Sequence, residues 1–140
     1  MLPLDGLKVL DLSRALSGPY STMILADLGA DVFMAEPLPR GVMSRGWGPM
    51  DRDMSVYYLS TNRNKTGLSL DFRDPKGSAL LRRLALQSDI VVENFRVGTM
   101  EKMGLGYEDL AAENPALIMA SISGYGRVGP AKNWAGFDQI

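Results

Sequence analysis

Three groups of residues have the types and positions needed to hold an anionic ligand. The first is the segment from Arg14 to Pro19, where backbone N–H groups at a predicted helix start can meet an anion. The second group consists of cations that can neutralise phosphate charge: Arg40, Arg45, Arg63, Lys65 and Arg73. The third group is Glu93-Asn94-Phe95-Arg96, at the end of a predicted strand. There the Asn side chain can hydrogen-bond a flat ring, and the Phe side chain can stack on it.

Each group also has a purely structural interpretation, and the residues alone leave both open. The first segment has neither G-x-G-x-x-G nor a Walker lysine, so it can be an ordinary tight turn. The cations can form a solvated surface, because exposed Lys and Arg are common. Phe95 can pack in the core at a strand end. Asp138 can act as a general base or as a turn residue.

Several kinds of chemistry are excluded by composition. The chain has no Cys and no His, so thiolate ligands, thiol nucleophiles and Ser-His catalysis are absent. Proton transfer must use Asp, Glu, Lys, Tyr or a ligand. We expect no bound metal. Fifteen Lys and Arg against sixteen Asp and Glu give a net charge of −1, which disfavours nucleic acid as a partner.

The N-terminus has no basic segment followed by a long apolar run, so we expect no signal peptide and a cytoplasmic location. No apolar run reaches the roughly 18 residues of a membrane span, so no membrane partner is expected. Length and 46% hydrophobic residues suit a folded domain. We treat 1–140 as one domain, incomplete because nothing stops the segment after Trp134.

The apolar pattern predicts strands alternating with helices, which is typical of an α/β protein with a mostly parallel sheet. Asp74-Pro75 is a strong helix start, and Gly29 suits a helix end. Ligands of such sheets bind beyond the carboxyl ends of the strands. Strands are expected at 7–12, 31–35, 66–71, 90–92 and 117–122, helices at 17–29, 74–86 and 107–113, and a long loop at 37–55.

A series of short segments, in this order along the chain, carries a family resemblance. They are Pro3-Leu4-Asp5-Gly6-Leu7-Lys8-Val9-Leu10-Asp11-Leu12, Ser17-Gly18-Pro19, Leu25-Ala26-Asp27-Leu28-Gly29-Ala30-Asp31-Val32, Glu36-Pro37, Asn62-Arg63-Asn64-Lys65, Leu68-Ser69-Leu70-Asp71, Val92-Glu93-Asn94-Phe95-Arg96, Met103-Gly104-Leu105-Gly106-Tyr107, Asn114-Pro115 and Ser121-Ile122-Ser123-Gly124-Tyr125-Gly126. With these segments the chain resembles the family III CoA-transferases, which include formyl-CoA transferase, carnitine CoA-transferase and the related α-methylacyl-CoA racemases. The resemblance implies the N-terminal, CoA-binding part of a large Rossmann-like domain with flanking helices.

The resemblance also implies which residues contact CoA, bound as a substrate rather than as a resident cofactor. Lys102 replaces a family arginine that contacts phosphate, Pro37 replaces an arginine that contacts the nucleotide, and Ala135 replaces a lysine. The expected contacts are Ala15, Leu16 and Ser17 near pantetheine or the thioester, Leu70 and Arg73 at the adenosine end, Asn94, Phe95 and Arg96 by the nucleotide and pyrophosphate, and Lys102 at phosphate.

The implied reaction moves CoA from an acyl-CoA to a carboxylic acid through an aspartyl-CoA thioester. The family's nucleophilic Asp aligns beyond Ile140, so no catalytic residue is assigned within the chain. One alternative is a racemase, disfavoured because Phe137-Asp138 stands where racemases have His-Asp. Another is a non-catalytic CoA-binding fragment. The full-length form is expected to be an interlocked homodimer.

Overall fold

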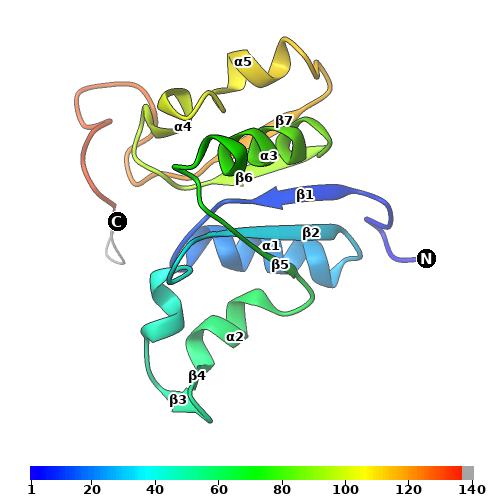
Figure 1. The fold of residues 1–140 in the computed structure, drawn as a ribbon, viewed down its shortest axis with the longest axis vertical. Coiled ribbons are helices and arrows are strands. Elements are labelled where there is room, and N and C mark those ends of the chain that lie inside the picture. Colours follow the sequence, from blue (N-terminus) through cyan, green and yellow to red (C-terminus); the bar gives the residue numbers. More distant parts are fainter. Residues whose placement is uncertain (137–140) are drawn as a thin grey trace.

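The computed structural model describes residues 1–136 and contains a five-stranded sheet in the order β5-β2-β1-β6-β7. Every neighbouring pair in this sheet is parallel, which confirms the α/β class. The order places β1 at the centre (Figure 1). Because all five strands run in the same direction, the loops that follow them lie along one edge of the sheet, although they come from distant parts of the sequence. The strands are β1 (Lys8–Asp11), β2 (Asp31–Pro37), β5 (Thr66–Leu70), β6 (Ile90–Glu93) and β7 (Ile118–Ser121).

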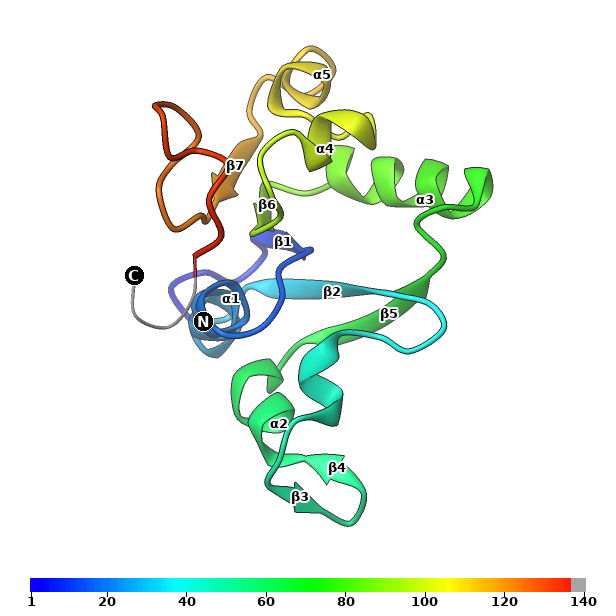
Figure 2. The ribbon, with the colours of Figure 1, turned by 90° about the vertical axis from the view of Figure 1, so that its left-hand side faces the viewer.

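Helices cover both faces of the sheet, so alternate strand residues enter two separate cores. Figure 2 shows α1 (Ser17–Asp27) on one side and α3 (Pro75–Leu86), α4 (Thr99–Lys102) and α5 (Tyr107–Ala111) on the other. Val9 and Val92 pack with Ala26 of α1. Leu10 and Val91 pack with Leu81 of α3 on the opposite face. Burial on both faces explains why these strands are nearly continuous apolar runs.

The two predicted helix boundaries are confirmed. Asp74 caps α3, because its carboxylate accepts hydrogen bonds from the backbone N–H groups of Lys76 (2.8 Å) and Gly77 (3.4 Å). Pro75 occupies the first position of α3. Gly29 follows α1 with a φ of +104°, a left-handed conformation that glycine adopts without strain.

The segment expected to be a long loop contains short regular elements. It holds a 3₁₀ turn η1 (Met43–Gly46) and a hairpin of β3 (Met50–Asp51) and β4 (Met54–Ser55), which extends away from the main sheet (Figure 2). The helix α2 (Val56–Asn62) that follows was not predicted, and neither was α4. The sequence of α2 is short and rich in residues of low helix propensity. Its formation depends on packing against α1 and on the Ser55 cap.

Replacing Gly77 by alanine should lower the free energy of unfolding by about 1–3 kcal/mol. A Cβ at this position would lie 2.0 Å from the backbone oxygen of Asp71. That clash outweighs the roughly 1 kcal/mol that alanine gains as a helix former. Urea unfolding measures the change. Gly67→Ala is the control, because its Cβ would meet nothing within 4 Å. Equal stability of the two variants would contradict the close approach.

Candidate functional site

A cleft of about 870 Å³ lies at the carboxyl ends of β1, β2, β5 and β6. Loops following these four strands supply most of its walls, and α4 with its neighbouring residue Met103 closes one side. This is the position where parallel α/β sheets bind ligands. The lining residues are Arg14, Pro37, Leu38, Pro39, Arg40, Gly41, Asp71, Phe72, Arg73, Asn94, Phe95, Arg96, Thr99 and Met103.

Four arginines line the cleft, and none of them has a carboxylate partner within residues 1–136. They are Arg14, Arg40, Arg73 and Arg96. The cleft's one described carboxylate, Asp71, accepts a hydrogen bond from the backbone N–H of Arg73 at 2.9 Å. Guanidinium groups that line one cleft without counter-ions provide charge and paired donors for phosphate or carboxylate oxygens. The cleft is therefore suited to an anion with several charged groups.

Asn94 joins the loops that follow β1 and β6. Its Oδ1 accepts a hydrogen bond from the backbone N–H of Arg14 (2.8 Å), and its Nδ2 donates to the Arg14 carbonyl (2.7 Å). The Arg14 guanidinium lies 4.7 Å from the centre of the Phe95 ring. Burial lowers the pKa of Arg14. Asn94 thus fixes the backbone of Arg14, a residue of the cleft wall. Half-buried Phe95 supports the Arg14 guanidinium and packs against the core.

Three of the five cations in the predicted basic group are held in structural ion pairs. Arg63 binds Asp27, and Lys65 binds Asp11. Arg45 binds buried Glu36 through Nε (2.6 Å) and Nη2 (2.5 Å). Of the two interpretations left open for this group, neutralisation of a ligand therefore does not hold for these three, because carboxylates of the chain already compensate them. Only Arg40 and Arg73 of this group line the cleft.

The Glu36 carboxylate anchors the end of β2 beside the cleft. Burial raises the pKa of Glu36, but hydrogen bonds from Arg45, Val42 and Tyr58 and the charge of Arg45 outweigh it, so the pKa lies below its ordinary value. The Tyr58 hydroxyl donates to Glu36 at 3.0 Å, and the Arg45 guanidinium lies 4.0 Å from the Tyr58 ring centre. This cluster fixes η1 and α2 against β2.

Tyr58 should keep its proton to unusually high pH. Its burial, and next the negative charge of Glu36, raise the pKa of Tyr58 from 10.0 to about 12. A raised folded-state pKa stabilises the fold below pH 10.0, and this contribution is lost as the pH rises through 12. Ultraviolet titration of the wild type minus Tyr58→Phe should show one phenol ionising near 12. A difference centred near 10.0 would contradict the buried pairing.

Comparison with known proteins identifies the family of this chain. Residues 4–140 match the family described as CoA-transferase family III. The chain belongs to this family. Its fold agrees closely with a CAIB/BAIF family protein from Brucella suis, with a TM-score of 0.93 and 45% identity over 99% of this chain and 38% of that one.

Curated relatives in the family III CoA-transferases are named for CoA transfer between acids. Human succinyl-CoA:glutarate CoA-transferase is 46% identical over 99% of this chain and 32% of its own length. Acetyl-CoA:oxalate CoA-transferase of Acetobacter aceti is 41% identical over 99% of this chain and 36% of its own length. The chain therefore spans about a third of the length of these relatives.

The structure brings some of the expected CoA contacts together and leaves others apart. Arg73 and the three residues Asn94, Phe95 and Arg96 line the cleft. Leu70 ends β5 one residue before the lining, partly packed against the core. Lys102 ends α4, exposed and outside the lining. Ala15, Leu16 and Ser17 connect Arg14 to α1, with Ala15 at a φ of +64° and Leu16 and Ser17 exposed.

Two of the positions where the chain departs from the family pattern have different surroundings. Pro37 lines the cleft, whereas Ala135 is exposed and lies outside the lining. Phe137 and Asp138 lie outside the described residues. Arg14 and Arg40 are site candidates that the resemblance did not single out. The sequence indicated these two residues in another way. Arg14 begins the segment that follows the first predicted strand, and Arg40 is one of the five cations of the basic group.

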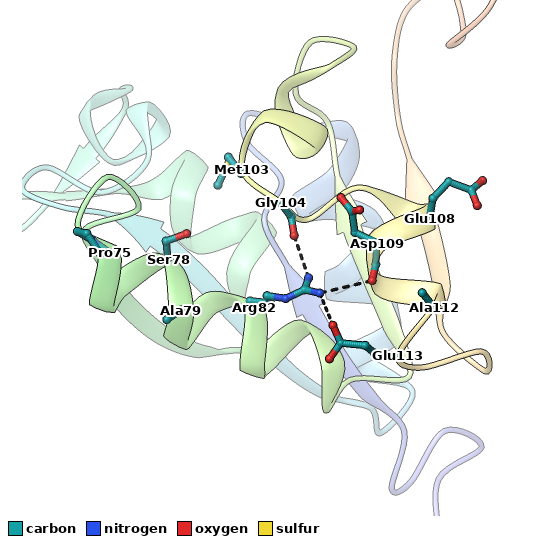
Figure 3. A pocket seen from close by; sticks show the side chains of 10 residues that line it. All are labelled: Pro75, Ser78, Ala79, Arg82, Met103, Gly104, Glu108, Asp109, Ala112 and Glu113. Carbon is teal, nitrogen blue, oxygen red and sulfur yellow. Dashed lines mark hydrogen bonds and ion pairs between the residues drawn. The ribbon is translucent and has the colours of Figure 1, made fainter.

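A second cavity of about 830 Å³ lies between α3 and the segment from Met103 to Glu113. Figure 3 shows the Arg82 side chain crossing it. Its Nη1 donates to the Gly104 carbonyl (2.9 Å), and its Nη2 pairs with Glu113 (2.5 Å). The cation in this cavity is compensated by the chain, and none of the cavity's lining residues belongs to the loops that directly follow β1, β2 and β6. The main cleft is therefore the stronger candidate for ligand binding.

Within residues 1–136, no cluster of three or more Asp and Glu side chains is arranged to hold a metal ion. No helix of the described chain is long and apolar enough to cross a membrane.

Proposed function

We propose that the protein is a CoA-transferase whose cleft holds the CoA moiety of an acyl-CoA. The observation that carries this proposal is the set of four unpaired arginines at the carboxyl ends of four parallel strands. CoA has a diphosphate and a ribose phosphate, which require several cations, and an adenine ring that can lie against Phe95 or Phe72. Family membership supports the same ligand.

The expected contacts divide along the length of CoA. Arg73, Asn94, Phe95 and Arg96 form the nucleotide end, with Asn94 acting through the backbone of Arg14. Ala15 to Ser17 approach pantetheine and the thioester from the start of α1. Leu70 supports the adenosine end from β5. Lys102 acts at longer range, because it is exposed outside the lining.

The substrates are an acyl-CoA donor and a carboxylic acid acceptor. Relatives are named for succinyl-CoA with glutarate, for succinyl-CoA with L-malate, and for acetyl-CoA with oxalate. These names support dicarboxylic acids as the first acceptors to examine.

The reaction we propose proceeds through carboxylate chemistry. An aspartate carboxylate attacks the thioester carbon, the C–S bond breaks, and a mixed anhydride and the CoA thiolate form. The thiolate then attacks the aspartyl carbonyl, which releases the donor acid and leaves an aspartyl-CoA thioester. The acceptor carboxylate attacks this thioester, giving a second anhydride and thiolate. Attack of the thiolate on the acceptor's carbonyl yields the new acyl-CoA and restores the aspartate.

The nucleophile is expected beyond Ile140, as the resemblance implies. The buried carboxylates at the strand ends are already committed to structural partners: Asp11 to Lys65, Glu36 to Arg45, and Glu93 to Arg127 at 3.1 Å. A nucleophilic carboxylate needs a free oxygen facing the thioester. We propose, as the resemblance implies, that the chain is the N-terminal, CoA-binding part of the large domain of a homodimeric enzyme, and that this enzyme is cytoplasmic.

The test is to incubate the full-length protein with succinyl-CoA and no acceptor, digest it, and map any CoA adduct by mass spectrometry. We expect a CoA thioester on an aspartate beyond Ile140, released as a new acyl-CoA when an acceptor acid is added. Epimerisation of a 2-methylacyl-CoA without transfer would instead support a racemase. CoA binding without either reaction would support a non-catalytic CoA-binding protein.

A further inference from the structure

By the strands that they follow, the four arginines of the cleft divide into two pairs, one on the β1–β6 side and one on the β2–β5 side. Arg14 is held towards β6, because Asn94 binds its backbone and Phe95 lies beneath its guanidinium. Arg96 follows β6 on the same side. Arg40 follows β2 and Arg73 follows β5, the strand at the opposite edge of the sheet.

Arg40 lies on a turn, residues 37–41, that is fixed at both ends. The Leu38 N–H donates to the Leu70 carbonyl at 2.8 Å, which ties the turn to β5. The Gly41 N–H donates to the Pro37 carbonyl (2.9 Å), and the next N–H, of Val42, donates to buried Glu36 (3.1 Å). Arg40 is exposed on this anchored turn, and no carboxylate of the described chain pairs with it.

Gly41 adds a reason for the fixed position of the turn. Its φ is +71°, and a Cβ there would lie 2.6 Å from Oε2 of Glu36 and 3.0 Å from the Arg45 side chain. The chain therefore passes close over the Glu36–Arg45 pair. The position of Arg40 is set by this buried cluster rather than by a mobile loop.

Because the two arginine pairs are separated, a ligand that binds both of them needs two anionic groups. Neighbouring strands lie about 4.8 Å apart, so the end of β6, which precedes Arg96, is roughly 14 Å from that of β5, which precedes Arg73, and roughly 10 Å from that of β2, which precedes Arg40. The two adjoining phosphates of a diphosphate do not cover either distance. A ligand that engages both pairs must have a second anionic group away from the diphosphate, and in CoA that group is the ribose phosphomonoester.

We propose that Arg40, together with Arg73, binds the ribose phosphomonoester and makes the protein select CoA over its 3′-dephospho form. This inference rests on the proposed function, in which the cleft holds CoA. A phosphomonoester has a second pKa near 6 and is almost doubly charged at neutral pH. Two guanidinium forks match that charge and its terminal oxygens. Arg14 and Arg96 then serve the diphosphate, which both ligands contain.

Calorimetric titration of the protein and its variants with CoA and with 3′-dephospho-CoA tests the assignment. Wild type should bind CoA about tenfold or more tightly than 3′-dephospho-CoA, from the usual strength of a charged hydrogen bond. Arg40→Gln should remove most of this preference by weakening CoA binding alone. Arg96→Gln should weaken both ligands by similar factors. The preference of the wild type should decline below a pH of about 6, as the phosphomonoester gains a proton.

Arg52→Gln is the matched control, because Arg52 lies at the turn of the β3–β4 hairpin, outside the cleft lining. It should leave both affinities unchanged, and circular dichroism verifies folding of each variant. Equal weakening of both ligands by Arg40→Gln, or no weakening, would overturn the role of Arg40 while leaving CoA binding intact. Failure of folded wild type to bind either ligand would overturn the proposed function itself.

Discussion

Replacing Lys65 by methionine should lower the free energy of unfolding by about 3–5 kcal/mol, the largest effect on stability that we expect. The Lys65 side chain is 2% exposed, and its ammonium lies 3.0 Å from the Asp11 carboxylate, whose side chain is 0% exposed. It also donates to the Pro19 carbonyl and to Asn62, each at 2.8 Å. Methionine fills similar space but leaves the Asp11 charge without its cation.

The other partners of Asp11 cannot replace that cation. Thr22 donates to Asp11 at 2.6 Å, and the Ser13 backbone N–H donates at 2.9 Å, but both groups are neutral. Urea unfolding at neutral pH measures the loss. Lys76→Met is the matched control, because Lys76 is exposed on α3 and should change stability by less than about 0.5 kcal/mol. Similar stability of the two variants would contradict a buried ion pair that holds α1, β1 and β5 together.

Replacing Arg96 by glutamine should raise the Kd for CoA by about 10–100-fold, the largest effect on binding that we expect. Arg96 is exposed, lines the cleft, and has no carboxylate partner in the described chain, so its charge is available to the ligand. The variant should also show a weaker dependence of binding on salt, because one cation fewer attracts the phosphates.

Arg83→Gln provides the comparison for this variant. Arg83 lies on α3, is exposed, and likewise has no described carboxylate partner, but it is outside the cleft. Calorimetry should find its CoA affinity unchanged. If both variants weakened CoA binding equally, the effect would reflect net charge, and Arg96 would have no specific role in the cleft.

The strands and main helices follow from apolar periodicity and helix-end residues, which act locally. Asp74-Pro75 starts α3 where predicted, and the apolar run at 90–92 becomes β6. By contrast, α2 and α4 are short and have little periodicity. Their stability comes from tertiary contacts, such as the packing of α2 against α1, which the local sequence does not reveal.

The site shows the same division between local and distant determinants. The sequence placed anion-binding candidates at the correct edge of the sheet, because parallel strands expose their carboxyl ends together. It did not separate available cations from compensated ones. Arg63 and Lys65 have partners 36 and 54 residues away, Asp27 and Asp11, so only the fold reveals that they are occupied.

The most direct test of the account is a calorimetric titration of the protein with CoA at low and moderate salt. The cleft predicts saturable binding at one site per chain, with an affinity that falls as salt screens the phosphates from Arg14, Arg40, Arg73 and Arg96. A folded protein that does not bind CoA, or that binds it with no dependence on salt, would contradict the assignment of this cleft to CoA.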